Sequence, residues 1–186
     1  AFALLMRSGW LDANKKGENP SLYDPMCGSG TILIEAAQYA ARIAPGTQRE
    51  HWGFSHWKGH DIPLWFKMLD EAKANQIKPT IQFVGTDIDS RVIKIAQDNA
   101  RLAGVSDFIQ FESADAIQFT GGFSSSGYIV SNIPYGERLG ELTELLPLFK
   151  NWGLHLKQNF QNWHLSLLTS NRDMLRQLRM VAGKEY

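Results

Sequence analysis

The segment Asp24-Pro-Met-Cys-Gly-Ser-Gly-Thr31 decides the fold of this chain. A short apolar run at residues 22–24 leads into it, and residues 31–42 behind it are rich in helix formers. We therefore expect a strand, a tight glycine turn and a helix whose free N–H groups face an anionic group such as a carboxylate. No Gly-Lys-Ser/Thr follows, and the third glycine of the dinucleotide fingerprint is missing. The segment is thus neither a P-loop nor a complete dinucleotide motif, and a plain tight turn is the alternative.

The same alternation of apolar runs and helical periodicity continues along the chain. Residues 1–7 resemble the end of a helix. We expect further strands at 81–86, 108–112, 128–131 and 165–169, and helices at 65–75, 91–103, 141–160 and 172–180. Ser90 is a suitable N-cap for the helix that begins at 91. Strands that alternate with helices predict an α/β fold, here a Rossmann-like, mostly parallel, doubly wound sheet.

The composition limits the kind of protein. A length of 186 residues fits one domain over 1–186, and a single cysteine cannot form an internal disulfide, which fits a reducing, cytoplasmic setting. No apolar run reaches the roughly 18 residues of a membrane helix. The 19 Lys and Arg balance 19 Asp and Glu, so no net positive charge attracts nucleic acid. Because the chain lacks an initiator Met and stops just after a helical pattern, we expect it to be part of a longer protein.

Polar residues follow four of the predicted strands, where parallel sheets bind ligands. They are Asp24, Asp87, Asp115 and Asn132. A carboxylate at 87 can accept hydrogen bonds from both ribose hydroxyls, and it is a poorer helix cap than Asp89 or Ser90, which lie nearer the helix start. Asp115 can accept from an adenine amino group or can be an ordinary turn residue. The pattern predicts a nucleoside cofactor.

The motif Ser131-Asn-Ile-Pro-Tyr-Gly136 follows the fourth strand. An amino nitrogen on a planar base is a poor nucleophile because its lone pair is delocalised. The Asn132 side-chain oxygen and the carbonyl of Ile133 or Pro134 can accept its hydrogens and stabilise the developing positive charge. Tyr135 can stack on the planar group and hold it in line with an electrophile. An ordinary strand-ending turn is the alternative.

Other chemistry fits less well. Cys27 lies in the glycine turn, where a small side chain is needed, and this interpretation is favoured over a covalent, nucleophilic role. His51, His56 and His60 match no standard zinc spacing. We therefore expect no metal. The Trp- and His-rich excursion at 44–66 is interpreted as a packed segment over the sheet, with a base-stacking platform as the alternative.

These motifs together resemble the THUMP-associated RNA guanine-N2 methyltransferases and, among them, the bacterial 23S ribosomal RNA enzymes. The resemblance is carried in family order by segments that span nearly the whole chain: 24–37, Ile43-Ala-Pro-Gly46, Trp57, Asp61, Leu64-Trp65, Gly85-Thr-Asp-Ile-Asp-Ser-Arg91, Asn99-Ala100 and Asn132-Ile-Pro-Tyr-Gly-Glu-Arg-Leu139.

The resemblance implies a class I methyltransferase that uses S-adenosylmethionine and modifies a guanine N2 of large-subunit ribosomal RNA, bound mainly through regions outside residues 1–186. The cofactor-binding residues that it implies are Asp24, Cys27, Gly28, Ser29 and Gly30 for the methionine part, Asp87 and Ile88 for ribose and adenine, Asp115 for the adenine amino group, and Asn132. The residues that it implies for the target guanine are Asn132, Pro134 and Tyr135.

Two features depart from the family pattern. Ile133 stands where many relatives have proline, which we expect to loosen the turn. The strand pair that closes family domains is expected to be cut off at Tyr186. Three alternatives stay open: an adenine-N6 or glutamine-amide methyltransferase, a cofactor-binding fragment that is inactive alone, and a dinucleotide-dependent oxidoreductase, which the missing third glycine disfavours.

Overall fold

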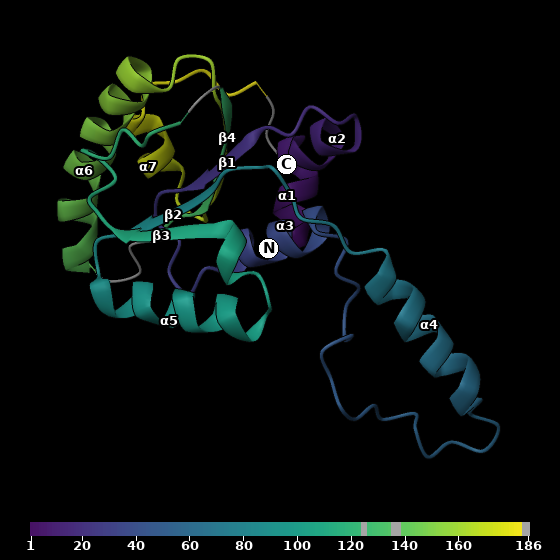
Figure 1. Cartoon of the computed structure of the whole chain (residues 1–186). Helices are drawn as coiled ribbons and strands as arrows, with labels where there is room; N and C mark the ends of the chain where they lie inside the picture. The colour runs from purple at the N-terminus through teal and green to yellow at the C-terminus, as the bar shows by residue number, and fades with distance from the viewer. Residues whose placement is uncertain (124–125, 135–138, 184–186) are drawn as a thin grey trace.

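Five parallel strands form one sheet in the computed structural model, which describes residues 1–123, 126–134 and 139–183 (Figure 1). Their spatial order is β3-β2-β1-β4-β5. Their bounds are β1 (Ser21–Asp24), β2 (Phe83–Asp87), β3 (Ile109–Ser113), β4 (Gly127–Asn132) and β5 (His164–Leu168). All four neighbouring pairs are parallel, so the carboxyl ends of the strands meet along one edge. The predicted parallel α/β sheet is confirmed.

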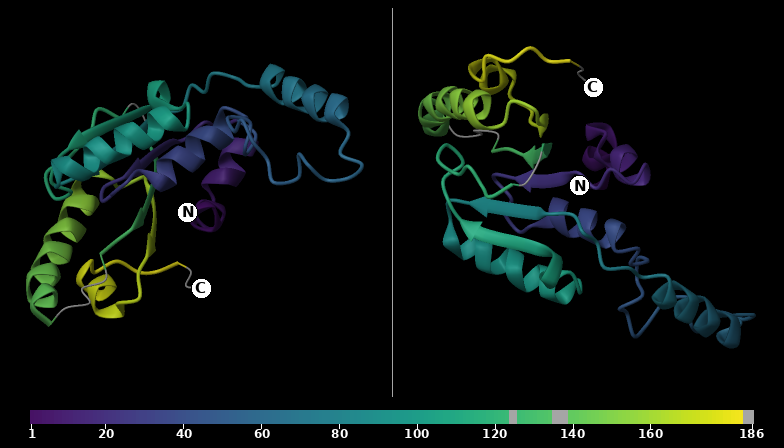
Figure 2. Two further views of the ribbon diagram at one scale, coloured as in Figure 1. Left: turned by 90° about the horizontal axis from the view of Figure 1, so that it is seen from below. Right: turned by 45° about the horizontal axis from the view of Figure 1, so that its top comes forward.

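Helices cover both faces of the sheet (Figure 2). The bounds are α1 (Phe2–Ser8), α2 (Trp10–Lys15), α3 (Thr31–Ala40), α4 (Ile62–Ala74), α5 (Ser90–Leu102), α6 (Leu139–Asn159) and α7 (Arg172–Gln177), with a short 3₁₀ turn at Ser106–Phe108. One core joins α1, α2, α3 and α5 to the sheet, and a second core joins α6 and α7 to its other face. The sheet is therefore doubly wound, as predicted.

The start of α5 differs from the prediction in one detail. Asp89, not Ser90, is the N-cap residue, and its side chain accepts a hydrogen bond from the backbone N–H of Arg91. Asp89 has the extended backbone of a cap, whereas Ser90 is already helical. Asp87 is consequently not needed as a cap and is available at the sheet edge.

The excursion between α3 and β2 projects away from the sheet as an arm that ends in α4 (Figure 1). Trp52 and Phe54 lie against Trp65 of α4, with ring centroids 5.2 and 4.9 Å apart. At the base of the arm, the backbone N–H of Ile77 donates to the carbonyl oxygen of Ala41 at 3.0 Å. The prediction of a packed excursion over the sheet is wrong about its place, because the aromatic rings pack on one another and on α4.

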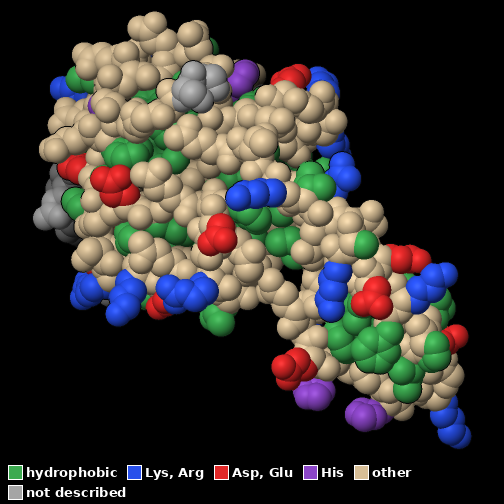
Figure 3. All heavy atoms as spheres, viewed as in Figure 1, with side chains coloured by type: hydrophobic (Ala, Val, Ile, Leu, Met, Phe, Trp, Pro, Cys, Tyr) green, Lys and Arg blue, Asp and Glu red, His purple; other side chains and the backbone are tan. Residues whose placement is uncertain are grey.

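The surface carries charges of both signs. On the face drawn in Figure 3, acidic and basic side chains are interspersed, and apolar side chains gather on the arm. The large exposed hydrophobic residues of α4 are Ile62, Leu64, Phe66 and Met68. Of the helices in the described part of the chain, none combines the length and the apolar character needed to cross a membrane.

Candidate functional site

Polar residues of three adjacent strands converge at the carboxyl edge of the sheet. Asp24 ends β1, Asp87 ends β2 and Asn132 ends β4. Because β1 pairs with both β2 and β4, these ends are neighbours in space although they are far apart in the sequence. The strand-end placement predicted for these residues agrees with the structure. In open parallel sheets this edge is where ligands bind.

Asp87 holds the glycine turn. Its Oδ2 accepts a hydrogen bond from the backbone N–H of Gly28 at 3.0 Å, and its Oδ1 accepts one from the backbone N–H of Asp89 at 3.0 Å. The carboxylate is half-buried. Each carboxylate oxygen can accept more than one hydrogen bond, so Asp87 retains acceptor capacity for a ligand hydroxyl.

The turn itself is tightly packed on its inner side and open at Gly28. Gly30 has φ +79°, and a Cβ there would lie 2.8 Å from Cζ of Phe111 and 3.1 Å from Cβ of Ala96. Gly28 has φ +51° and no atom within 4 Å of a Cβ position. A ligand can therefore approach the backbone at Gly28, while a side chain at 30 would displace the core beneath it.

Asn99 of α5 also supports the turn, and its role was not evident from the sequence. Its side-chain Nδ2 donates to the carbonyl oxygen of Ser29 at 3.0 Å. The hydrogen bond spans 70 residues of sequence. Asn99 formed part of the family resemblance, but periodicity alone places it on the solvated face of a helix.

Asp24 is buried, with 1% of its surface exposed. Its Oδ1 accepts hydrogen bonds from the Ser131 hydroxyl at 2.7 Å and from the backbone N–H of Met26 at 3.3 Å. Burial raises the pKa of this carboxyl to about 7, and the nearby Asp87 carboxylate acts in the same direction. The chain thus places a carboxyl group that titrates near neutrality directly before the glycine turn.

Cys27 is a small core residue within the turn. Its backbone N–H donates to the carbonyl oxygen of Thr86 at 2.9 Å, and its side chain is 7% exposed. Burial raises the pKa of the thiol well above its usual range, so the thiolate is disfavoured. These observations support the small-residue interpretation of Cys27 over a nucleophilic one.

The segment after β3 lies against the end of β2. The backbone N–H of Ala114 donates to the carbonyl oxygen of Asp87 at 3.1 Å. Asp115 is half-buried, and its Oδ1 accepts from the backbone N–H of Ile117 at 3.0 Å, which is the local turn role considered from the sequence. Ile88 is 76% exposed beside this segment. The carbonyl of Ile88 accepts from the Ser113 hydroxyl at 3.4 Å, which places Ile88 beside the segment that leads to Asp115.

The end of β4 is hydrogen-bonded to β5 through Ile133. Ile133 is buried, and its backbone N–H donates to the carbonyl oxygen of Leu168 in β5 at 3.2 Å. A proline at 133 has no N–H and would lose this hydrogen bond. Isoleucine thus gives the backbone at 133 a hydrogen bond that proline would lack. The rest of the turn, from residue 135 on, lies outside the described residues, so its loosening stays a prediction. Asn132 and Pro134 are exposed, and Tyr135 lies outside the described residues.

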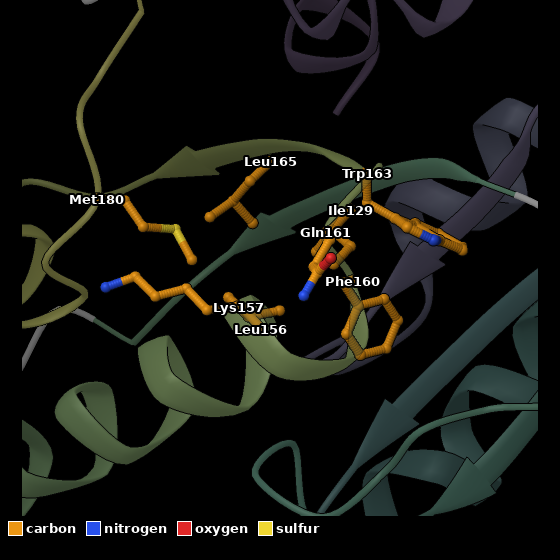
Figure 4. Close-up of a pocket in the computed structure, with 8 residues that line it drawn as sticks. All are labelled: Ile129, Leu156, Lys157, Phe160, Gln161, Trp163, Leu165 and Met180. Carbon is orange, nitrogen blue, oxygen red and sulfur yellow. The ribbon is translucent and has the colours of Figure 1, made fainter.

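A hollow and the histidine-containing arm lie away from this edge of the sheet. An apolar hollow of about 290 Å³ opens beside the first residues of β5, where Leu156, Trp163 and Leu165 line it (Figure 4). In the described ranges, no three His, Cys, Asp or Glu side chains meet in a way that could hold a metal ion. His60 packs on the rings of Phe54 and Trp65 in the arm.

Comparison with known sequences identifies the family. The model of the RMKL-like methyltransferase domain matches residues 1–186. A ribosomal RNA large subunit methyltransferase K/L from Pseudoalteromonas atlantica is 52% identical over 187 residues, which cover 100% of this chain and 26% of that protein. Its counterpart from Shewanella amazonensis is 45% identical over 190 residues with the same coverage. The chain thus spans about a quarter of the length of these relatives.

Solved structures agree with this assignment. A predicted N6-adenine-specific DNA methylase from Listeria monocytogenes has a TM-score of 0.82 and 34% identity, over 89% of this chain and 43% of that one. SMU.472, a putative methyltransferase complexed with SAH, has a TM-score of 0.82 and 30% identity, over 89% and 44%. The sheet order, the glycine turn and the match over the whole chain lead to one conclusion: this chain belongs to the RMKL-like methyltransferase domain family.

Proposed function

We propose that this chain is the catalytic part of an enzyme that transfers a methyl group from S-adenosylmethionine to the exocyclic N2 of a guanine in large-subunit ribosomal RNA. The observation that carries the proposal is the shared edge of β1, β2 and β4. There the glycine turn, held by Asp87, lies beside the strand that ends at Asn132. A methyl donor bound on the turn and a base bound at the end of β4 would therefore meet.

The residues present fit S-adenosylmethionine, which supplies the electrophilic methyl group. Asp87, with acceptor capacity to spare, would bind the ribose hydroxyls, and the exposed Ile88 would lie against the adenine ring. The turn from Cys27 to Gly30 opens at Gly28 and would take the methionine carboxylate at the N-terminus of α3. Asp24 would lie beneath the methionine part, and Asp115 would accept from the adenine amino group. The SAH complex of SMU.472 supports this choice of cofactor.

The end of β4 would bind the nucleophile. The Asn132 side-chain oxygen and the carbonyl of Ile133 or Pro134 would accept the two hydrogens of the guanine amino group. Acceptors in these positions favour a pyramidal nitrogen and stabilise the positive charge that forms as the nitrogen attacks. Tyr135 would stack on the base, which has to leave its own stack in the RNA to reach the edge.

The balance of charges bears on which part of the protein would bind the RNA. The sequence has equal numbers of basic and acidic residues, and charges of both signs are interspersed on the face in Figure 3. Counterion release by Lys and Arg supplies much of the affinity for RNA. We therefore assign most of that affinity to regions outside residues 1–186, and we place the enzyme in the cytoplasm, where ribosomal RNA is modified.

The test uses the full-length protein and ribosomal RNA that lacks modifications. The wild type is expected to methylate a guanine at N2, which mapping of the modified nucleotide will show. Asn132→Ala should retain cofactor binding by calorimetry and lose methyl transfer, by about 100-fold or more for an electrostatic contact made in the transition state. Transfer by this variant close to the wild-type rate would contradict the role of Asn132.

A second candidate, methylation of adenine N6 in DNA, has one specific observation in its favour. The structure from Listeria monocytogenes at 34% identity is described as a predicted N6-adenine-specific DNA methylase. Adenine also presents an amino group on a planar ring, so the acceptors at the end of β4 suit it equally well. Comparing DNA and RNA substrates side by side, with the modified base identified, separates the two candidates.

A further inference from the structure

The carboxyl edge of the sheet contains buried polar side chains directly beneath the site. The fully buried residues Thr86 and Ser131 are each the penultimate residue of their strand, and Asp24 is the last residue of β1. Burial of a hydroxyl or carboxyl group costs free energy unless it is hydrogen-bonded. Each of the three is hydrogen-bonded at this edge. Besides its contact with the glycine turn, the Thr86 hydroxyl lies 2.9 Å from the Tyr23 hydroxyl of β1.

Two strands hold the start of the turn from opposite sides. From β2, the Thr86 hydroxyl donates to the carbonyl oxygen of Pro25 at 3.3 Å, and its carbonyl accepts from the Cys27 N–H. From β4, the Ser131 hydroxyl donates to Oδ1 of Asp24 at 2.7 Å. The contact from Ser131 to Asp24 joins residues 107 apart. It is shorter than both contacts of the Thr86 hydroxyl, which are 3.3 Å to Pro25 and 2.9 Å to Tyr23. It connects the strand of the acceptor motif to the turn of the methyl donor.

Ser131 is covalently joined to Asn132, and the two have opposite environments. Ser131 is fully buried, whereas Asn132, the last residue of β4, is exposed at the edge. After them, the Ile133 N–H is bonded to Leu168. The backbone that presents Asn132 is therefore held at residue 131 through a side chain and at residue 133 through the main chain.

We propose that Ser131 is a positioning residue for methyl transfer, acting through its hydrogen bond to Asp24. This inference rests on the proposed function. The Ser131 hydroxyl fixes the distance between the Asn132 acceptor and the glycine turn, and so the approach of the amino nitrogen to the methyl group. A displacement of about 1 Å between reacting groups can cost about 100-fold in rate. Ser131 does not itself touch either substrate in this scheme.

The experiment measures single-turnover methylation and cofactor affinity in the full-length protein. Ser131→Ala should lower the rate by about 10- to 100-fold, while the dissociation constant for S-adenosylmethionine changes by less than about threefold. Ser131→Thr, which retains a hydroxyl, should restore most of the rate. Ser21→Ala is the matched control, because Ser21 is also a buried serine, at the opposite end of β1. It should react like the wild type.

The outcomes separate this inference from the proposed function. An active wild type with an unchanged rate in Ser131→Ala overturns only the role of Ser131. So does a loss of rate in folded Ser131→Ala that is matched by an equal loss of cofactor affinity, because that is the signature of a general structural role. If Ser131→Ala does not fold, Ser131→Cys replaces it, because cysteine has the shape of serine but is a weak hydrogen-bond donor. Ser131→Cys should show the same loss of rate, with the same small change in cofactor affinity, as is expected of Ser131→Ala. A wild type that transfers no methyl group overturns the proposed function and this inference together.

Discussion

The backbone N–H of Gly28 lies 3.0 Å from Oδ2 of Asp87, so the glycine turn after β1 is anchored to the last residue of β2. The partners are 59 residues apart in the sequence. A carboxylate in this position organises the turn in addition to any bond that it makes to a ligand. Loss of Asp87 should therefore disturb cofactor binding in two ways.

Asp87→Ala should weaken binding of S-adenosylmethionine by at least about tenfold, because a hydrogen bond to a charged group contributes about 1.5–3 kcal/mol. Titration calorimetry measures the change. Asp98→Ala is the control, since it removes a carboxylate from the exposed surface of α5 that pairs with nearby Arg101. Equal affinities for both variants and the wild type would show that Asp87 does not serve the cofactor.

Gly30→Ala should destabilise the fold by about 1–3 kcal/mol, the usual cost of overpacking. The added Cβ would lie 2.8 Å from the Phe111 ring, and the backbone at Gly30 has a positive φ. Urea denaturation gives the change in the free energy of unfolding. Gly53→Ala is the matched control because no atom lies within 4 Å of its Cβ position. A Gly30→Ala midpoint equal to that of the control would disprove the close packing under the turn.

The buried carboxyl of Asp24 should make stability fall as the pH rises. Its pKa is raised to about 7 in the folded state, whereas an unfolded chain releases the proton near pH 4. Between these values the folded state binds the extra proton, so the free energy of unfolding decreases with increasing pH and levels off above about 7. Asp24→Asn, which is neutral throughout, should flatten this dependence.

Urea unfolding at several pH values between about 4.5 and 8 tests this expectation. The quantity to compare is the difference between Asp24→Asn and the wild type, since other groups titrate equally in both. The variant should gain relative stability as the pH rises towards 7. Parallel curves would show that Asp24 does not titrate in this range. Asp98→Asn, on the exposed surface of α5, controls for loss of one negative charge.

The arm should be removable without unfolding the core. A short Gly/Ser linker in place of residues 45–76 keeps the Ile77–Ala41 hydrogen bond that closes its base. The shorter loop lowers the entropic cost of folding by about 1–2 kcal/mol, which offsets the lost bond from Gln48 to the carbonyl oxygen of Ala103. The free energy of unfolding should stay within about 1 kcal/mol of the wild type. Loss of a cooperative transition would mean that the arm belongs to the core.

The sequence was sufficient to predict the parts of the site that depend on local signals. The glycine turn lies between a short apolar run and a helix-forming stretch, and Asp24, Asp87 and Asn132 each directly end a strand. The alternation of strands with helices predicts a parallel sheet, and parallel strands align their carboxyl ends. That these three residues share one edge of the sheet was therefore predictable. The six-residue helix α2 was not predicted, because one and a half turns leave too short a periodic pattern.

Contacts between distant segments were not predictable from the sequence. The bond from Asn99 to Ser29 and the bond from Ser131 to Asp24 depend on how elements pack. The direction of the arm was misjudged for the same reason, since aromatic residues can pack on one another as well as on a sheet. The backbone hydrogen bond of Ile133 likewise depends on a neighbouring strand, because the pairing of β4 with β5 brings the Leu168 carbonyl within reach.

The sheet order also has a consequence for biosynthesis. β1 is made first but lies in the middle, and its bond partner Ser131 follows Asp24 by 107 residues. A ribosome that adds roughly 5–20 residues per second needs on the order of 5–20 s to cover that distance. For this time β1 lacks one of its neighbours, and Asp24 lacks the hydroxyl that will cover it. Asp24, although made early, thus reaches its final environment late. It does so only when β4 pairs with β1 and brings the Ser131 hydroxyl to it.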